Sequence, residues 1–223
     1  MSKTGVLLVN LGSPDSTSVS DVRKYLREFL MDGRVLDAPW PIRWCVVNLL
    51  ILPKRPKESA EAYEKVWTKD GSPLVVTSKK VHELLQDRTE LPIELAMRYQ
   101  NPSIESALEK LNTQGVTDLF MIPLFPHYAM SSFETAVERV KELITQNYSG
   151  MQVTSQAPYF EDADYVDALV ASIKPHLKAP FDKLLFSYHG IPERHLRKSD
   201  PTGSHCLTKP DCCEGCHPAH DFC

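Results

Sequence analysis

A histidine that follows a short apolar run could carry chemistry in this chain. The run 184–186 leads into His189, which is followed by Gly190 and, two residues later, Pro192. Apolar runs bounded by glycine and proline are typical of strands that end in turns, so residues 183–188 are predicted to form a strand. Ligands bind beyond the carboxyl ends of strands in open α/β sheets, and a neutral imidazole can bind a metal ion or accept a proton. The alternative is a turn histidine with a structural hydrogen bond.

A second histidine, His127, also follows an apolar run, residues 119–126. It too is predicted just beyond a strand, so we expect His127 and His189 to face one crevice. The alternative for His127 is a turn position beside a core tyrosine.

The end of the chain is rich in cysteine. Cysteines at this density, with one Cys-x-x-Cys pair, indicate a metal site, whereas scattered reduced thiols are the alternative. Thiolates suit Zn²⁺ or an iron–sulfur cluster, and the spacing does not choose between them. The residues are Cys206, Cys212, Cys213, Cys216 and Cys223, with His205, His217 and His220 among them.

Residues 37–57 form an apolar segment with a basic end. It contains Trp40, Trp44 and the run 46–52, followed by Lys54, Arg55 and Lys57. Such a lip suits the edge of a flat, apolar, acid-bearing ligand or a membrane surface. A buried helix with a solvated basic turn is the alternative.

The remaining pattern alternates strands and helices. Strands are predicted at 6–11, 93–99, 116–124 and 151–156, and helices at 18–30, 59–67, 75–85, 103–111, 132–148 and 162–177. This order predicts an α/β fold with a mostly parallel sheet covered by helices on both faces. From residue 190 the pattern fails, which indicates a fragment with an incomplete second half.

Bulk composition narrows the class of protein. Apolar residues make up 42% and charged residues 24%, as in a soluble globular protein, and a net charge of −4 gives no general attraction to nucleic acid. The first apolar run is too short for a signal peptide, and no run is long enough to span a membrane. We therefore expect a cytoplasmic protein. Peripheral contact of the lip with a membrane is compatible with this expectation.

With these features assembled, the chain resembles the ferrochelatases, which insert Fe²⁺ into a porphyrin at the end of haem synthesis. The resemblance covers residues 5 to about 201. It is carried, in order, by LVNLGSP at 8–14, EAY at 61–63, GSPL at 71–74, MRY at 97–99, PLFPHY at 123–128 and SYHGIP at 187–192.

The resemblance implies two Rossmann-like halves around a porphyrin cleft. Residues 1–150 would form the first half, and residues 151–223 the start of the second. His189 matches the histidine at the metal and proton-abstraction site. Leu11 matches a position over the porphyrin face, Arg98 and Tyr99 match the active-site wall, and His127 lies in the loop that lines the cleft. Lys57, Tyr63 and Ser72 match positions that hold the porphyrin propionates.

Two departures from the family pattern are evident. The catalytic glutamate of the family, which lies in the second half, has no equivalent in this chain. The animal-type cluster takes a cysteine from the position where this chain has Met130. Residues 206–223 instead resemble an insertion of some bacterial members, which implies a [2Fe-2S] cluster, with zinc as the alternative. The implied ligands are Cys206, Cys213, Cys216 and Cys223, with Cys212 as a substitute.

The resemblance implies insertion of Fe²⁺, as substrate, into protoporphyrin IX. Coproporphyrin III is an alternative substrate, and a porphyrin- or metal-binding fragment without activity is an alternative function.

Overall fold

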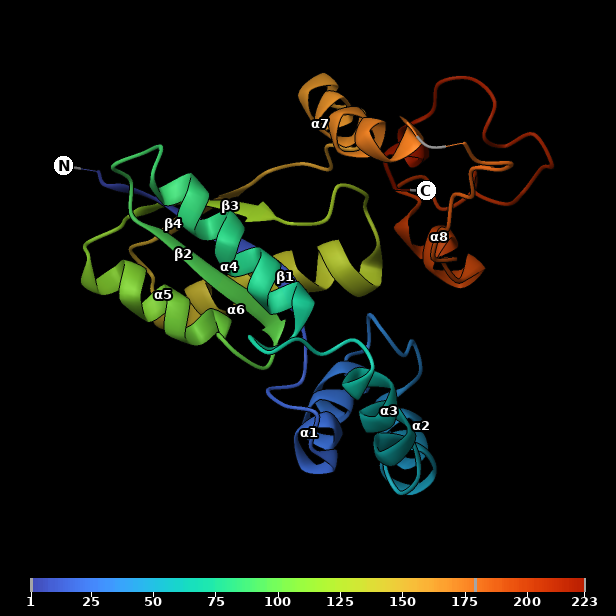
Figure 1. Cartoon of the computed structure of the whole chain (residues 1–223), viewed down its shortest axis with the longest axis horizontal. Helices are drawn as coiled ribbons and strands as arrows, with labels where there is room; N and C mark the ends of the chain where they lie inside the picture. The colour runs from blue at the N-terminus through green and yellow to red at the C-terminus, as the bar shows by residue number, and fades with distance from the viewer. Residues whose placement is uncertain (1, 179, 223) are drawn as a thin grey trace. The chain divides into compact units, whose positions relative to one another are not determined.

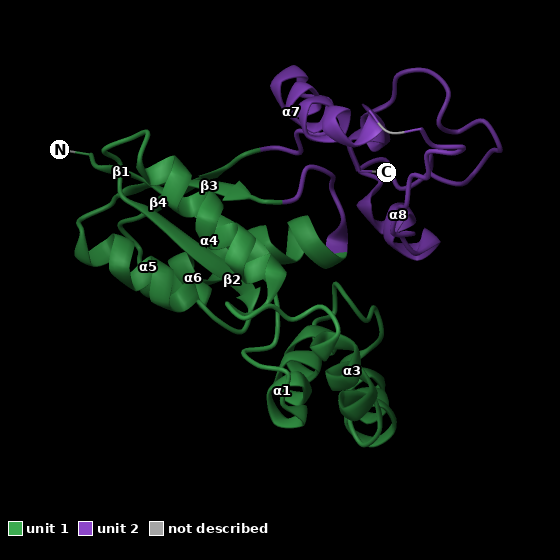
Figure 2. Cartoon of the chain, viewed as in Figure 1, with its two compact units in different colours: residues 1–124, 131–156 green, residues 125–130, 157–223 purple. Residues whose placement is uncertain are grey.

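The computed structural model describes residues 2–178 and 180–222 and divides the chain into two compact units. Unit 1 comprises residues 1–124 and 131–156, and unit 2 comprises 125–130 and 157–223 (Figure 2). The boundary near 156 lies close to the division expected at 150, but the loop 125–130 belongs to unit 2.

Unit 1 is built on a four-stranded parallel sheet with the order β2-β1-β3-β4. The strands are β1 (Thr4–Gly12), β2 (Ile93–Tyr99), β3 (Asp118–Pro123) and β4 (Gln152–Ser155). β1 is central, and its Val6 lies opposite Ile93 on one side and Phe120 on the other. The four strands predicted in this region and their parallel arrangement are confirmed.

Helices cover both faces of this sheet (Figure 1). On one face Val6 and Leu8 of β1 pack with Leu74 and Val75 of α4 (Pro73–Gln86). The other face is covered by α5 (Ile104–Thr113) and α6 (Thr135–Asn147), which continues η2, a π-helical turn at Met130–Glu134. The α/β class predicted from the alternation is therefore confirmed for unit 1.

Local signals explain where several helices begin. Ser18 Oγ accepts the backbone N–H of Asp21 at the start of α1 (Val19–Leu30), and Ser103 Oγ accepts that of Ser106 at the start of α5. Gly115, at φ +79°, follows the end of α5, where an L side chain would be strained.

The segment between α1 and α4 is helical. It contains α2 (Trp40–Cys45), η1 (Val46–Ile51, π-helical) and α3 (Arg55–Glu64). The helix predicted at 59–67 is observed as α3 at Arg55–Glu64, so it both begins and ends before the predicted residues. The earlier start is possible because Pro56 fits the first turn of a helix, where no intrahelical N–H is needed. None of the helices described at 2–178 and 180–222 is both long and apolar enough to cross a bilayer.

Unit 2 contains α7 (Ala163–Ile173), η3 (Lys174–Lys178, 3-10), α8 (Glu193–Ser199) and η4 (Pro218–Phe222, 3-10). The strand predicted at 183–188 is wrong, because this segment has no regular structure, and Leu185 and Tyr188 are 86% and 82% exposed. A strand requires a neighbouring strand for its backbone hydrogen bonds, and the described residues of unit 2 include none.

Candidate functional site

A cavity lies where β1 and β2 of unit 1 end. It has a volume of about 380 Å³ and is lined by residues that follow β1, by the loop 67–72 and by the start of α4. Ser72, predicted to hold a propionate, lies in this lining as the N-cap of α4, and its side chain makes no capping hydrogen bond. The buried Ser72 is therefore placed where a hydroxyl and a helix N-terminus meet an open space, an arrangement that suits an anionic group.

Tyr63 packs among aromatic residues, one of which lines this cavity. Its ring packs edge-on against Trp67, with centroids 6.1 Å apart, and Trp67 lines the cavity with Ser72. It also packs edge-on against Tyr25 of α1 at 6.3 Å, and burial raises the pKa of Tyr63 above its ordinary value. Ser72 thus lines the cavity, whereas Tyr63 contacts it only indirectly, through Trp67.

Lys57 and Leu11 are the other two residues of unit 1, apart from the wall residues, that were predicted to contact the porphyrin. Lys57 is exposed on α3, and Leu11, near the end of β1, is half-buried against the aromatic cluster of Tyr25 and Tyr99. Within residues 2–178 and 180–222, the Lys57 ammonium forms no hydrogen bond or ion pair.

Arg98 and Tyr99, the predicted wall residues, meet at one carboxylate. Arg98 Nη2 donates to Asp32 Oδ2 at 2.6 Å, and the Tyr99 hydroxyl donates to the same oxygen at 3.0 Å. Arg98 Nε also donates to the Thr135 hydroxyl at 2.8 Å, and that hydroxyl in turn donates to Asp32 Oδ2. Tyr99 is fully buried, so it supports the wall from within the core.

The charge of Asp32 is well stabilised in this network. Burial works to raise the pKa of Asp32, but the Thr135 hydroxyl, the backbone N–H of Arg34 and the guanidinium of Arg98 together lower it below its ordinary value. Burial strongly raises the pKa of the Tyr99 phenol, which therefore stays protonated and donates. The network joins the end of α1 to β2 and α6.

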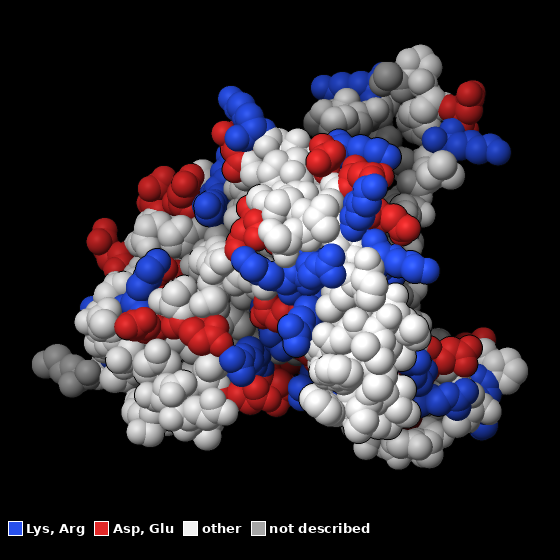
Figure 3. All heavy atoms as spheres, turned by 90° about the horizontal axis from the view of Figure 1, so that it is seen from below, with Lys and Arg blue, Asp and Glu red and all other residues white. Residues whose placement is uncertain are grey.

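The apolar lip at 37–57 is exposed. Trp40 is 61% exposed, and Leu49 and Leu50 are 60% and 68% exposed, whereas Val47 and Leu52 anchor the segment in the core. The buried-helix alternative is therefore wrong for most of the segment. Figure 3 shows basic and acidic side chains intermingled beside broad uncharged areas on the face that it displays.

The two predicted histidines both belong to unit 2. His189 is exposed and its Nδ1 lies 2.7 Å from the carbonyl oxygen of Gly190, while His127 is exposed and its ring stacks on Phe160 at 5.1 Å. No hydrogen bond or ring contact joins His127 to His189 in the described part of unit 2. The placement of His189 at the end of a strand is wrong, because residues 183–188 form none.

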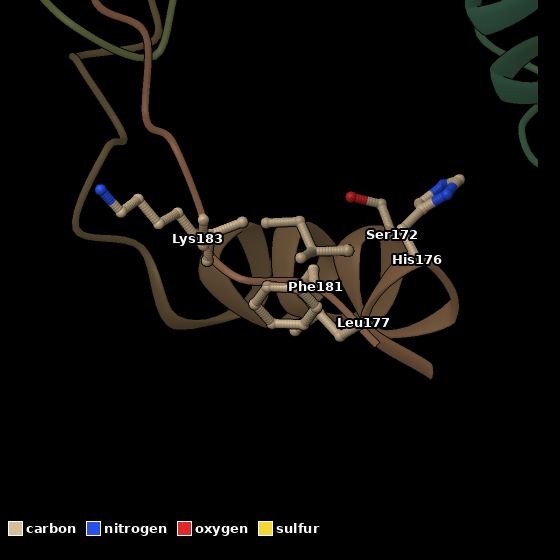
Figure 4. Close-up of a pocket in the computed structure, with 7 residues that line it drawn as sticks. Ser172, His176, Leu177, Phe181 and Lys183 are labelled. Carbon is tan, nitrogen blue, oxygen red and sulfur yellow. The ribbon is translucent and has the colours of Figure 1, made fainter. Parts of the chain in front are cut away.

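A cavity of about 520 Å³ lies elsewhere in unit 2, between the helical segment 172–177 and the chain at 181–184 (Figure 4). Its lining is mainly apolar, and Figure 4 shows Phe181 lying against the helix while the Lys183 amine points away from it. The start of the predicted strand thus lies along a helix.

The described cysteines of the last segment, which are Cys206, Cys212, Cys213 and Cys216, are not grouped as ligands of one metal ion. Cys206 is buried, and its backbone N–H donates to Asp200 Oδ2 at 2.9 Å, while the sulfurs of Cys212 and Cys213 lie 3.9 Å apart. Cys216 is exposed and Cys223 lies outside the described residues. Among the described histidines, cysteines, aspartates and glutamates, no group of three or more is placed to hold a metal ion. The donor types therefore suit a thiolate-bound metal, but their described positions do not form its site.

Asp200 organises the backbone of this segment. It accepts the Thr202 hydroxyl and the backbone N–H groups of Thr202, His205 and Cys206, at distances between 2.7 and 2.9 Å. The Thr202 hydroxyl contributes most to a pKa of Asp200 that is held well below its ordinary value.

Sequence reasoning missed Asp32 and Trp67. Asp32 had an indirect signal, since an arginine inside an apolar strand requires a carboxylate partner when the strand is buried. Nothing in the sequence identified which of the acidic residues supplies that partner, because Asp32 and Arg98 are 66 positions apart.

Comparison with known proteins identifies the family. The ferrochelatase family profile matches residues 3–213. The ferrochelatase of Opitutus terrae is 51% identical over 226 residues, covering 100% of this chain and 66% of the relative. That of Stutzerimonas stutzeri is 48% identical over 215 residues, covering 96% and 63%, and that of Pseudomonas syringae pv. tomato is 49% identical over 214 residues, covering 96% and 62%. The chain therefore spans a little under two thirds of these relatives' length, and it belongs to the ferrochelatase family.

Proposed function

We propose that this protein acts as a ferrochelatase, which inserts Fe²⁺ into protoporphyrin IX to form protohaem. The observation that carries the proposal is the family match over residues 3–213, which includes the motif around His189. The cavity beside Ser72, at the carboxyl ends of β1 and β2, supports it because ligands of open α/β sheets bind at that edge.

The side chains proposed for the porphyrin have complementary chemistry. The Ser72 hydroxyl, the Tyr63 phenol and the Lys57 ammonium are suited to carboxylates, which accept charge-assisted hydrogen bonds. Leu11 and the exposed lip supply apolar surface for the macrocycle, and Arg98 and Tyr99 stiffen the wall through Asp32. A stiff wall favours catalysis when it fits a distorted porphyrin better than a planar one.

His189 is the proposed catalytic residue, and His127 lies in the proposed cleft loop. An imidazole can take a pyrrole proton or hold the incoming iron, because its neutral form offers one unprotonated nitrogen. Its exposure leaves the ring accessible to both reactants. The pH dependence of iron insertion would distinguish proton acceptance by His189 from iron binding by His189.

Iron insertion tests this proposal. The assay follows porphyrin fluorescence anaerobically after Fe²⁺ is added, with the product of the whole coding frame. His189→Ala is expected to abolish insertion and leave porphyrin binding within a few-fold, whereas His176→Ala, a matched exposed histidine of unit 2, leaves the rate unchanged. Near-normal insertion by His189→Ala would remove this residue from the reaction.

The same assay distinguishes two alternative functions. Coproporphyrin III in place of protoporphyrin IX would give the faster rate if the carboxylate-binding residues serve four acidic groups. Porphyrin binding without insertion would favour a binding module, as would a coding frame that stops at Cys223.

For the cysteine-rich segment we propose a [2Fe-2S] cluster bound by Cys206, Cys213, Cys216 and Cys223, with zinc as the alternative metal. The support is the thiol chemistry of the segment, and binding would have to draw these residues together, as metals do in small metal-dependent segments. Iron and acid-labile sulfide in the purified protein are expected, and both should be lost in Cys213→Ser. Zinc without sulfide would replace the cluster.

We further propose that the lip contacts a membrane surface in the cytoplasm. Its exposed tryptophans and leucines beside Lys54, Arg55 and Lys57 suit an acidic bilayer surface. Co-sedimentation with anionic vesicles that is lost in Leu50→Ser would support this contact.

A further inference from the structure

The cavity beside Ser72 contains a basic side chain that no motif identified. Ser72, Val75 and Lys79 line the cavity from α4, and their spacing of three and four positions places them on one face of that helix. Lys79 is the only lysine or arginine among the described residues of this lining. A ligand in the cavity therefore meets the Ser72 hydroxyl at the start of α4 and Lys79 about two turns further along.

The Ser72 hydroxyl and the Lys79 ammonium are both available to a ligand. Ser72 is 7% exposed, and its hydroxyl neither caps α4 nor forms another hydrogen bond with a residue that the structure describes. The Lys79 side chain is exposed and has no hydrogen bond or ion pair in the same part of the chain. Both groups can therefore donate to oxygen atoms of a ligand.

The two groups can reach one carboxylate. Seven positions of an α-helix correspond to a rise of about 10 Å. Long side chains on a helix lean toward its N-terminus, which for Lys79 is the direction of Ser72. The flexible lysine side chain can therefore span much of that rise, and a carboxylate bound between the two groups would bridge the rest.

Two acidic residues oppose an anion in this cavity. Asp15 and Asp70 line it as well, and both Asp15 oxygens accept from the Asn101 amide, at 3.1 and 2.8 Å. With two acidic residues and one basic residue, the lining carries a formal charge of −1, which would become −2 without Lys79. Because like charges at close range repel, Lys79 is the group in the lining whose charge favours a bound carboxylate.

We propose that Lys79 is a specificity-determining residue that binds one porphyrin carboxylate together with Ser72, an inference that rests on the proposed function. The ammonium donates a charge-assisted hydrogen bond to the carboxylate, and the Ser72 hydroxyl donates a second one. An esterified side chain lacks the charge that Lys79 recognises, so it gains little from this residue. The two aspartates sharpen the selection, because they disfavour a carboxylate that Lys79 does not neutralise.

Binding of protoporphyrin IX and of its dimethyl ester tests this role. Both porphyrins are delivered in the same detergent to the product of the whole coding frame, and quenching of tryptophan fluorescence gives the dissociation constants. The parent protein is expected to bind the diacid more tightly than the diester. Lys79→Met should weaken diacid binding about ten- to hundredfold, as for the loss of one charge-assisted hydrogen bond, and leave diester binding within about twofold. In the insertion assay, the same change should raise KM for the porphyrin and leave kcat within about twofold.

Lys80→Met is the matched control. Lys80 is the neighbouring exposed lysine of α4 and does not line the cavity, so its replacement should leave both dissociation constants unchanged. Lys79→Arg keeps the positive charge and should retain the preference for the diacid, and far-ultraviolet circular dichroism reports the folding of each variant. An unchanged preference in Lys79→Met would overturn the assignment. An equal loss of preference in Lys80→Met would also overturn it, because the effect would then be one of general surface charge.

The role of Lys79 and the proposed function fail in different ways. A parent protein that binds neither porphyrin would refute the proposed function, and the role of Lys79 with it. A parent protein that binds the diacid and inserts iron into it, with the same diacid affinity after Lys79→Met, would refute the role of Lys79 alone.

Discussion

Replacing Asp32 by asparagine would test how unit 1 holds its wall residues. Asp32 Oδ2 accepts from Arg98, Tyr99 and Thr135, and Oδ1 accepts the backbone N–H of Arg34 at 2.7 Å. An asparagine retains one oxygen for the backbone N–H of Arg34. Its amide group then faces the other three donors, so it cannot accept from them.

The magnitude follows from burial. The Asp32 and Arg98 side chains are 7% and 14% exposed, and removing one member of a buried ion pair costs about 3–5 kcal/mol. The unpaired Tyr99 hydroxyl would contribute about 1–3 kcal/mol of this cost, as expected for a buried donor. Because about 1 kcal/mol shifts Tm by roughly 2–4 °C at this domain size, Asp32→Asn should lower Tm by roughly 6–20 °C.

Thermal unfolding followed by circular dichroism measures this shift. Glu138→Gln is the matched control, because Glu138 pairs with Lys141 on the surface of α6 and an exposed pair contributes about 0–1 kcal/mol. A double-mutant cycle with Arg98→Met should give a coupling of about 1 kcal/mol or more between positions 32 and 98. An Asp32→Asn shift no larger than the control, with no coupling, would refute the assignment of this network as a stabilising one.

Three further predictions follow from single contacts. The pKa of Asp32 is lower in the folded chain than in the unfolded one, so its charge contributes stability that is complete above about pH 4 and lost as pH falls through the folded pKa. Between pH 7 and pH 3 the free energy of unfolding, measured by equilibrium denaturation, should therefore fall more for the parent protein than for Asp32→Asn. Equal losses in the two proteins would contradict this prediction. Gly12→Ala should lower the free energy of unfolding by at least about 2 kcal/mol, because Gly12 has φ +105° and a Cβ would collide with the Tyr99 carbonyl oxygen. Gly150→Ala is the control. A Cβ at Gly150 would meet no atom within 4 Å, so this change should alter the free energy of unfolding by less than about 0.5 kcal/mol in urea titrations. Ser103→Ala should cost about 1 kcal/mol by removing the cap of α5, measured the same way, and a neutral result would show that water replaces this hydrogen bond.

The amino-acid sequence determined the organisation of unit 1. Apolar runs and periodicity located β1 to β4 and the helices α1, α3, α4, α5 and α6, because the spacing of apolar residues is a local property of the sequence, whereas α2 and η1 were not predicted. Ser18 and Ser103 cap their helices as such residues do wherever a helix follows them. The motifs also identified the family, since short motifs in a fixed order do not require knowledge of their contacts.

Only the tertiary structure decided the contacts between distant residues. Strand formation at 183–188 depends on a neighbouring strand, and the apolar run 184–186 alone could not reveal that none is present among the described residues of unit 2. Asp32 acquires its partners from β2 and α6, which are distant from it in the sequence. Local sequence indicated most helices and strands of unit 1, whereas strand pairing and ion pairs depend on contacts between segments that are distant in the sequence.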